Sequence, residues 1–199
     1  MFIVTSHDAL RVLLGYSGAT VNATPTTHRA VDLISLPCFT PVFCSTLIAA
    51  AEAAGAFASA PGDPVPGHEI SLARISPVLY ENLESDMGER IWPRLQEEWE
   101  LIEYRGINDA FVIRYDATTG TALRLHHDVA QVSASVKLND DYSGGMLEFP
   151  RQGFTNADIP VGHLLAWPSL VTHPHRSTPV TRGVKYSLTI WFELPIVLD

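Results

Sequence analysis

The sequence predicts a mainly β fold, a sandwich or barrel of strands with helices packed on one face. Of the 199 residues, 46% are apolar, which is enough for one domain with a sizeable core. Helical patterns lie in the first half of the chain, and short apolar segments separated by turn residues follow Arg105-Gly106. Helices first and many strands later are typical of this architecture.

Residues 1–36 have the least regular pattern, and we expect a peripheral N-terminal segment there, ahead of a single domain at residues 37–199. Residues 9–14 predict a short helix. The segment has neither a basic leader nor a continuous apolar stretch, so we expect no signal peptide and no membrane span. We expect a cytoplasmic location. Cys38 and Cys44 are too few for a disulfide framework and are expected to be reduced.

The first strong helix signal follows Pro41. Ser45 and Thr46 can cap the apolar run at residues 47–54, and Gly55 can end it. This pattern predicts a helix that starts near residue 45 and ends before the glycine.

A proline- and glycine-rich stretch at residues 60–67 comes next and predicts a surface loop, either a lid beside a pocket or a plain connector. Ser76 and Pro77 are a capping residue and a first-turn proline, and they begin a helical segment that reaches about Glu98. Pro93 is expected to kink or divide this helix, because proline lacks the backbone N–H that a helix interior needs.

Strand patterns dominate the remainder of the chain. Predicted strands cover residues 69–73, 110–115, a run ending near residue 126, 129–138, 146–149, 163–167 and 184–190. Turn residues at 139–145 and 181–183 separate some of them. Short strands of this kind predict the sandwich or barrel.

The charge balance excludes one class of partner. The net charge is −9, and charged residues make up only 18% of the chain. Binding to a nucleic-acid backbone needs basic patches that release counterions, so we expect no nucleic-acid partner.

The candidate chemistry begins at His126 and Asp128. Side chains two positions apart on a strand project to the same side, so this imidazole and this carboxylate could grip one cation. His173 or His175 could supply a third ligand. Two histidines and one carboxylate with open positions are the ligand set of non-haem Fe(II) oxygenases.

A lysine near the end of the chain adds a second constraint. If residues 179–183 form a turn, His175 and Lys185 lie on neighbouring antiparallel strands. Alternation then places Lys185 and Ser187 on one face, with Thr189 and Trp191, and the apolar residues between them on the other. A buried ammonium needs a carboxylate partner, which a dicarboxylate co-substrate would supply; the alternative is a lysine that reaches solvent.

The segment from about Phe111 to Trp191 resembles the Fe(II)/2-oxoglutarate-dependent prolyl and lysyl hydroxylases. The motifs similar to the procollagen lysyl hydroxylase branch are Leu123-Arg124-Leu125-His126-His127-Asp128, the turn from Leu138-Asn139 to Gly144-Gly145, and His173-x-His175 followed by Pro179, Gly183 and Lys185. The resemblance implies a double-stranded β-helix, or jelly roll, with N-terminal helices packed on one sheet and iron at one open end.

The resemblance also implies roles for particular residues. His126, Asp128 and His175 would bind the metal. Lys185 would pair with the far carboxylate of 2-oxoglutarate, where many relatives use arginine, and Ser187 and Tyr115 would contact the same molecule. His127 is expected to face away from the metal, and the offset of ten residues between His175 and Lys185 favours His175 over His173 as the third ligand.

The activity implied is Fe(II)- and 2-oxoglutarate-dependent hydroxylation of an unactivated C–H bond. O2 is the second co-substrate, and ascorbate is allowed as an accessory reductant. The expected substrate is a lysine or proline residue in a peptide. A free amino acid or another small molecule is the first alternative, and a vestigial metal-binding module or a zinc hydrolase is less favoured, since a zinc hydrolase does not explain Lys185 and Ser187.

Overall fold

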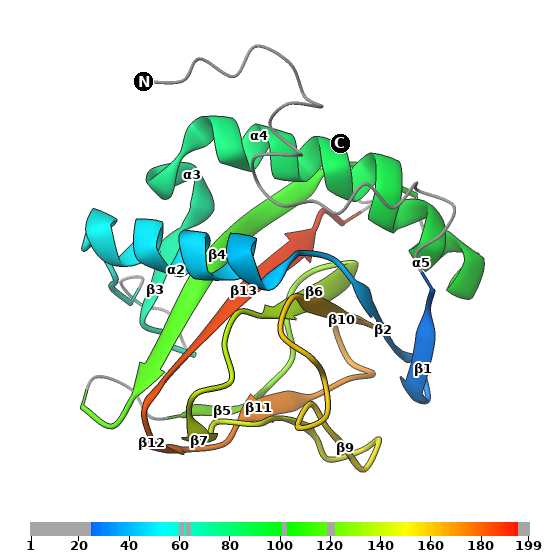
Figure 1. Ribbon diagram of the computed structural model, residues 1–199. Helices are drawn as coiled ribbons and strands as arrows, with labels where there is room; N and C mark the ends of the chain where they lie inside the picture. Colours follow the sequence, from blue (N-terminus) through cyan, green and yellow to red (C-terminus); the bar gives the residue numbers. More distant parts are fainter. Residues whose placement is uncertain (1–24, 60–61, 63–64, 101–102, 119–121, 195–199) are drawn as a thin grey trace.

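Two facing β-sheets, covered on one side by helices, make up the computed structural model, which describes residues 25–59, 62, 65–100, 103–118 and 122–194 (Figure 1). The strands are β1 (Thr27–Ala30), β2 (Leu33–Pro37), β3 (Glu69–Ser71), β4 (Ile107–Asp116), β5 (Leu123–His126), β6 (Val132–Lys137), β7 (Ser143–Gly144), β8 (Leu147–Phe149), β9 (Phe154–Thr155), β10 (His163–Pro168), β11 (His175–Ser177), β12 (Val180–Arg182) and β13 (Val184–Phe192). The helices are α2 (Pro41–Ala54), α3 (Leu72–Ile75), α4 (Pro77–Asp86), the π-helical segment η2 (Met87–Ile91) and α5 (Trp92–Glu98).

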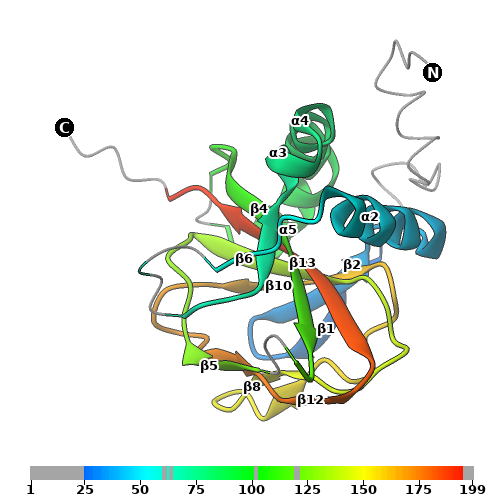
Figure 2. The same cartoon turned by 90° about the vertical axis from the view of Figure 1, so that its left-hand side faces the viewer.

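The large sheet has seven strands in the order β1-β2-β10-β6-β13-β4-β3, and the small sheet has four in the order β5-β11-β8-β9. A separate pair, β12-β7, joins them at one end. All pairs are antiparallel. The helices lie on the outer face of the large sheet, away from the small one (Figure 2). The predicted mainly β architecture with helices on one face is confirmed.

The two faces of β13, an inner strand of the large sheet, line two different interiors. Leu188, Ile190 and Phe192 project to the helix side and are at most 1% exposed in the main core. Lys185, Ser187, Thr189 and Trp191 project to the opposite side and line a cavity between the two sheets. The predicted alternation along this strand is therefore confirmed, and it separates the packing face from the face that carries polar chemistry.

Helix α2 ends where the sequence predicts but begins earlier. The Thr40 hydroxyl accepts a hydrogen bond from the backbone N–H of Phe43, and Pro41 occupies the first turn, while Gly55 closes the helix at a φ of +62°. Ser45 and Thr46 are interior residues whose hydroxyls donate to the carbonyl of Val42. The prediction that they form the cap was wrong, because Thr40 before a proline is the stronger start.

The second helical region begins at Ser76, as predicted, with the Ser76 hydroxyl accepting from the backbone N–H of Leu79 and Pro77 in the first turn. Pro93 divides it into α4 and α5. The π-helical turns of η2 precede the proline. Wider turns of this kind accommodate a residue that cannot donate to the regular ladder.

The start of the chain differs from expectation. The predicted boundary at residue 36 falls inside β2, which pairs with β10, and β1 pairs with β2. Residues 27–36 are thus part of the large sheet, because the alternating apolar side chains of β2 are needed in both interiors: Leu33 packs in the cavity-side core, and Ile34 and Leu36 in the main core. The helix predicted at residues 9–14 lies outside the described residues, as does part of the loop at 60–67.

Two further expectations concern the described residues only. Cys38 and Cys44 are buried free thiols, as predicted. Among the helices in the described ranges, none is long and apolar enough to cross a membrane.

Candidate metal centre and its cavity

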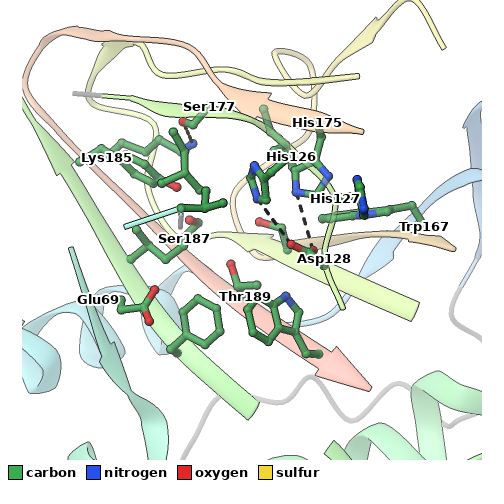
Figure 3. Close-up of a pocket in the computed structure, with 18 of the residues that line it drawn as sticks. Glu69, His126, His127, Asp128, Trp167, His175, Ser177, Lys185, Ser187 and Thr189 are labelled. Carbon is green, nitrogen blue, oxygen red and sulfur yellow. Dashed lines mark hydrogen bonds and ion pairs between the residues drawn. The ribbon is translucent and has the colours of Figure 1, made fainter. Parts of the chain in front are cut away.

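Strand pairing in the small sheet brings the two key histidines together. β11 pairs with β5 so that His175 lies directly opposite His126, and their ring centroids are 4.5 Å apart. Asp128 does not lie on the strand as predicted, because β5 ends at His126 and the carboxylate comes from the loop that follows. The loop turns this side chain back toward both rings (Figure 3).

The three side chains direct one atom each toward a common point. His126 Nε2 lies 3.5 Å from Asp128 Oδ1, and His175 Nε2 lies 3.7 Å from Asp128 Oδ2. One ligand atom from each residue lies within 4.8 Å of the others. Both Nδ1 atoms are engaged by backbone carbonyls, those of Arg124 at 2.7 Å and His173 at 3.0 Å, so the Nε2 atoms are the ones turned inward.

The charges of the cluster depend on one another. Burial opposes a charge on His126, but the hydrogen bonds to Asp128 and to the Arg124 carbonyl, together with the negative charge of Asp128, outweigh it and raise the pKa of this imidazole. Burial would raise the pKa of Asp128, yet His126 and His175 hold it below its usual range. Burial lowers the pKa of His175. A buried anion beside two imidazoles that offer Nε2 is the environment that a divalent cation stabilises.

The two remaining histidines of the motifs have other places. His173 is 2% exposed, with Nδ1 2.9 Å from the Thr172 hydroxyl and Nε2 3.2 Å from the carbonyl of Val31, so it ties two loops together. His127 lines the same cavity but is not one of the three clustered residues. The structure therefore groups His175, and not His173, with His126 and Asp128.

Lys185 enters the cavity from the other sheet. The prediction that His175 and Lys185 lie on neighbouring strands was wrong: β11 belongs to the small sheet and β13 to the large one, and β12 lies between them in the chain. Only the facing of the two sheets brings them near each other. Lys185 Nζ donates to the Ser177 hydroxyl at 3.0 Å, and Ser177 lies two positions after His175 on the same strand.

The side chain of this lysine is almost fully shielded from water. Lys185 is 4% exposed, and its Nζ lies 4.5 Å from the centre of the Tyr115 ring. Burial, assisted by the positive charge of Lys137, lowers its pKa to about 7. Burial also raises the pKa of Tyr115, which keeps its phenol protonated. Ser187 lines the same end of the cavity. This end thus offers one cation and several hydroxyls, the set of donors that an anionic ligand requires.

The cavity has a volume of about 260 Å³ and extends beyond these residues. Phe111 and Trp191 both line it, with their ring centroids 5.0 Å apart. Glu69 adds a carboxylate from β3 (Figure 3). Glu69 pairs in register with Ile113, another lining residue, so both side chains face inward.

Sequence reasoning missed Ser177 and Glu69. Strand alternation after His175 could have identified Ser177, since residues two apart share a face. Nothing in the local pattern marks Glu69, because its position in the cavity follows from the pairing of β3 with β4.

The match to a family model decides how these features are to be interpreted. Residues 110–193 match the 2OG-Fe(II) oxygenase superfamily, and this range contains His126, Asp128, His175 and Lys185. Residues 110–193 belong to the 2OG-Fe(II) oxygenase superfamily. The ligand set in the oxygenase domain also fits the metal: two imidazoles and one carboxylate with open positions are typical of non-haem Fe(II) oxygenases.

Curated relatives of the oxygenase domain are procollagen lysine hydroxylases. The chain is 28% identical over 168 residues to a procollagen lysyl hydroxylase and glycosyltransferase of Acanthamoeba polyphaga mimivirus, covering 79% of this chain and 19% of that protein. It is 34% identical over 82 residues to a multifunctional procollagen lysine hydroxylase and glycosyltransferase of Caenorhabditis elegans, covering 40% of this chain and 11% of that one. The chain thus spans a fifth or less of the length of these relatives.

Solved structures show the same fold. A viral collagen prolyl hydroxylase from Paramecium Bursaria Chlorella virus-1 superposes with a TM-score of 0.62 at 16% identity, covering 82% of this chain and 97% of that one. A prolyl-4-hydroxylase of Pseudomonas putida gives a TM-score of 0.60 at 21% identity, covering 82% and 93%. The expected jelly roll is confirmed.

Proposed function

We propose that the chain is an Fe(II)- and 2-oxoglutarate-dependent hydroxylase in which His126, Asp128 and His175 bind the metal. The observation that carries this proposal is the meeting, in one cavity, of the three ligand atoms with a buried lysine from the opposite sheet. A metal site alone would fit several chemistries. The buried cation beside it fits an anionic co-substrate.

The bound iron would supply the activation of O2 together with the oxidation of 2-oxoglutarate, and the chain would position the reactants. Lys185, with Tyr115 and Ser187 nearby, would receive the far carboxylate of 2-oxoglutarate. Ser177 already fixes the position of Nζ at 3.0 Å. The apolar wall would restrict water near the metal, so that oxidation is directed to the bound substrate.

We further propose that the substrate is a peptide whose reacting residue is cationic, which favours lysine over proline. Glu69 places a carboxylate in the same cavity that the paired rings of Phe111 and Trp191 line. Its charge reaches Tyr115, whose pKa it helps to raise. A carboxylate with aromatic faces stabilises an ammonium group, whereas the neutral ring of proline gains nothing from it. The curated relatives act, by their names, on procollagen lysine.

Turnover of 2-oxoglutarate tests the metal assignment. We expect His126→Ala and His175→Ala to abolish succinate formation, because each removes a ligand atom from the cluster. His28→Ala is the control, since His28 is an exposed residue of β1 that pairs with Glu98. Succinate release at the wild-type rate in either ligand variant would refute the assignment.

The substrate class is tested by mass spectrometry of peptides that differ at one residue. A lysine peptide should gain one oxygen coupled to succinate, while the norleucine peptide, which lacks the ammonium group, and the proline peptide should react poorly. Glu69→Gln should raise KM for the lysine peptide by about tenfold or more, since bonds to charged groups contribute about 1.5–3 kcal/mol. KM for 2-oxoglutarate should stay constant. Equal reaction of the norleucine peptide would contradict the role of Glu69, and reaction of free lysine alone would favour a small-molecule substrate.

A further inference from the structure

The Asp128 carboxylate receives a hydrogen bond from a buried serine. Ser133 Oγ donates to Asp128 Oδ2 at 2.6 Å, and Ser133 is fully buried. Ser133 lies on β6 of the large sheet, opposite Trp191 of β13. Asp128 is thus held from the sheet that faces its two histidine partners.

A second serine completes a chain of hydrogen bonds. Ser169 Oγ donates to Ser133 Oγ at 2.7 Å and is 5% exposed. A hydroxyl that accepts one hydrogen bond donates its own proton in a defined direction, and here that direction is toward Asp128. The order Ser169 to Ser133 to Asp128 therefore orients the proton of Ser133 onto one carboxylate oxygen.

The backbone holds the same two loops together. Ser169 N–H donates to the Gln131 carbonyl at 3.2 Å, and Leu170 N–H donates to the Asp128 carbonyl at 3.0 Å. Leu170 has a φ of +58°, a left-handed conformation that is strained for a residue with a side chain. Leu170 lies in the loop after β10, at the point where this loop meets the loop of Asp128. The loop after β10 leads directly to His175.

We propose that Ser133 and Ser169 form a positioning relay for the metal-binding carboxylate. The relay engages Oδ2 of Asp128 and leaves Oδ1, which faces His126 Nε2 at 3.5 Å, for the cation. It also fixes the loop before β11 relative to the loop of Asp128. The Asp128 carboxylate then keeps a constant position relative to the rings of His126 and His175. The inference rests on the proposed metal site, and neither serine would touch the metal itself.

Cobalt(II) titration followed by its visible absorption is the test, because it measures metal affinity without turnover. Groups that orient metal ligands typically contribute about 10–100-fold to affinity, and we expect Ser133→Ala to weaken Co²⁺ binding by a factor in this range. Ser135→Ala is the matched control, since Ser135 lies two positions away on the same face of β6 and opposite Thr189. It should bind Co²⁺ as the wild type does.

A double-mutant cycle separates a relay from two independent supports. Ser169→Ala alone should weaken Co²⁺ binding, and adding it to Ser133→Ala should cause no further loss, because Ser169 acts through Ser133. Thermal unfolding of the metal-free variants shows whether a loss merely reflects instability. Ser133→Cys, which keeps the shape and a weak donor, should give an intermediate affinity even if Ser133→Ala folds poorly.

The results that would overturn the relay differ from those that would overturn the metal site. Unchanged Co²⁺ affinity in Ser133→Ala and Ser133→Cys, or additive losses in the double variant, would reject the relay while leaving the metal site in place. Failure of the wild-type protein to bind Co²⁺ would reject the metal site and the relay with it.

Discussion

Lys185 is the titratable residue whose interior position has the clearest consequence for pH. Burial lowers its pKa to about 7, against 10.5 for an exposed lysine. Between these values the unfolded chain holds a proton that the folded chain has released. Because the unfolded state then binds more protons, the contribution of Lys185 to stability rises with pH across this window and is least favourable below pH 7.

The same residue predicts how co-substrate affinity depends on pH. A dianionic 2-oxoglutarate requires the charged ammonium, so binding takes up a proton above pH 7. We expect the Kd for 2-oxoglutarate to rise by up to about tenfold per pH unit above that point, as linkage requires. Anaerobic calorimetry in buffers of different ionisation enthalpy would measure the proton uptake.

Lys185→Arg is the matched control for this prediction. Arginine stays protonated throughout the window, so its Kd should change little with pH. An equal pH slope in the wild type and in Lys185→Arg would show that another group controls the titration.

Single residues also mark how far sequence reasoning could go. The motif residues His126, Asp128 and His175 were predicted, and they cluster. Ser133 was not, because its hydrogen bond to Asp128 depends on how the loop after β5 folds back onto β6. Local patterns define which face of a strand a side chain occupies, but they do not define which other strand lies opposite.

Among the elements, the short β12-β7 pair lies where the chain enters β13 and requires a close backbone contact. Gly144 of β7 has a φ of +75°, and a Cβ at this position would collide with the backbone carbonyl of Pro179. We expect Gly144→Ala to destabilise the protein by clearly more than the 1–2 kcal/mol or so that a left-handed backbone costs alone. Urea unfolding would measure the difference in free energy.

Gly153 provides the comparison for that prediction. Its φ is +61°, yet a Cβ there would meet no atom within 4 Å. Gly153→Ala should therefore lose only the cost of the left-handed conformation. If both variants were destabilised equally, the close approach of β7 to the chain at Pro179 would not be a significant constraint.

The ends of helices and strands were predicted well where a local sequence signal sets them. They were predicted less well where tertiary packing sets them. Gly55 and Ser76 mark real helix boundaries because each supplies a terminal conformation or hydrogen bond that the backbone needs. The start of α2 was misplaced because Ser45 and Thr46 can also cap a helix and follow Thr40, the actual cap, closely in the chain. The strand at residues 27–30 was missed because it is an exposed edge without an alternating pattern.

At the scale of the whole molecule, function depends on the meeting of two sheets. The small sheet carries His126 and His175, and the loop after β5 carries Asp128. The large sheet carries Lys185 and Glu69. On an isolated sheet, none of these groups would form a binding site. Facing one another, they combine a metal site, a site for an anion and a second carboxylate in one cavity.

The overall fold was predictable because helix and strand patterns occupy different parts of the chain. The relative placement of β11 and β13 was not predictable. The chain between them forms the strand β12, which pairs with β7, instead of a simple turn. A spacing of ten residues fits both arrangements. Only the assembled sheets distinguish them.

The most direct test of the proposed function is the visible absorption of the protein with Fe(II) and 2-oxoglutarate under anaerobic conditions. We expect a charge-transfer band in the wild type when both are present, because the metal and co-substrate sites share one cavity. His175→Ala should lose the band, and Lys185→Met should require much more 2-oxoglutarate to form it. No band in the wild type, or the same band in His175→Ala, would contradict the proposed function.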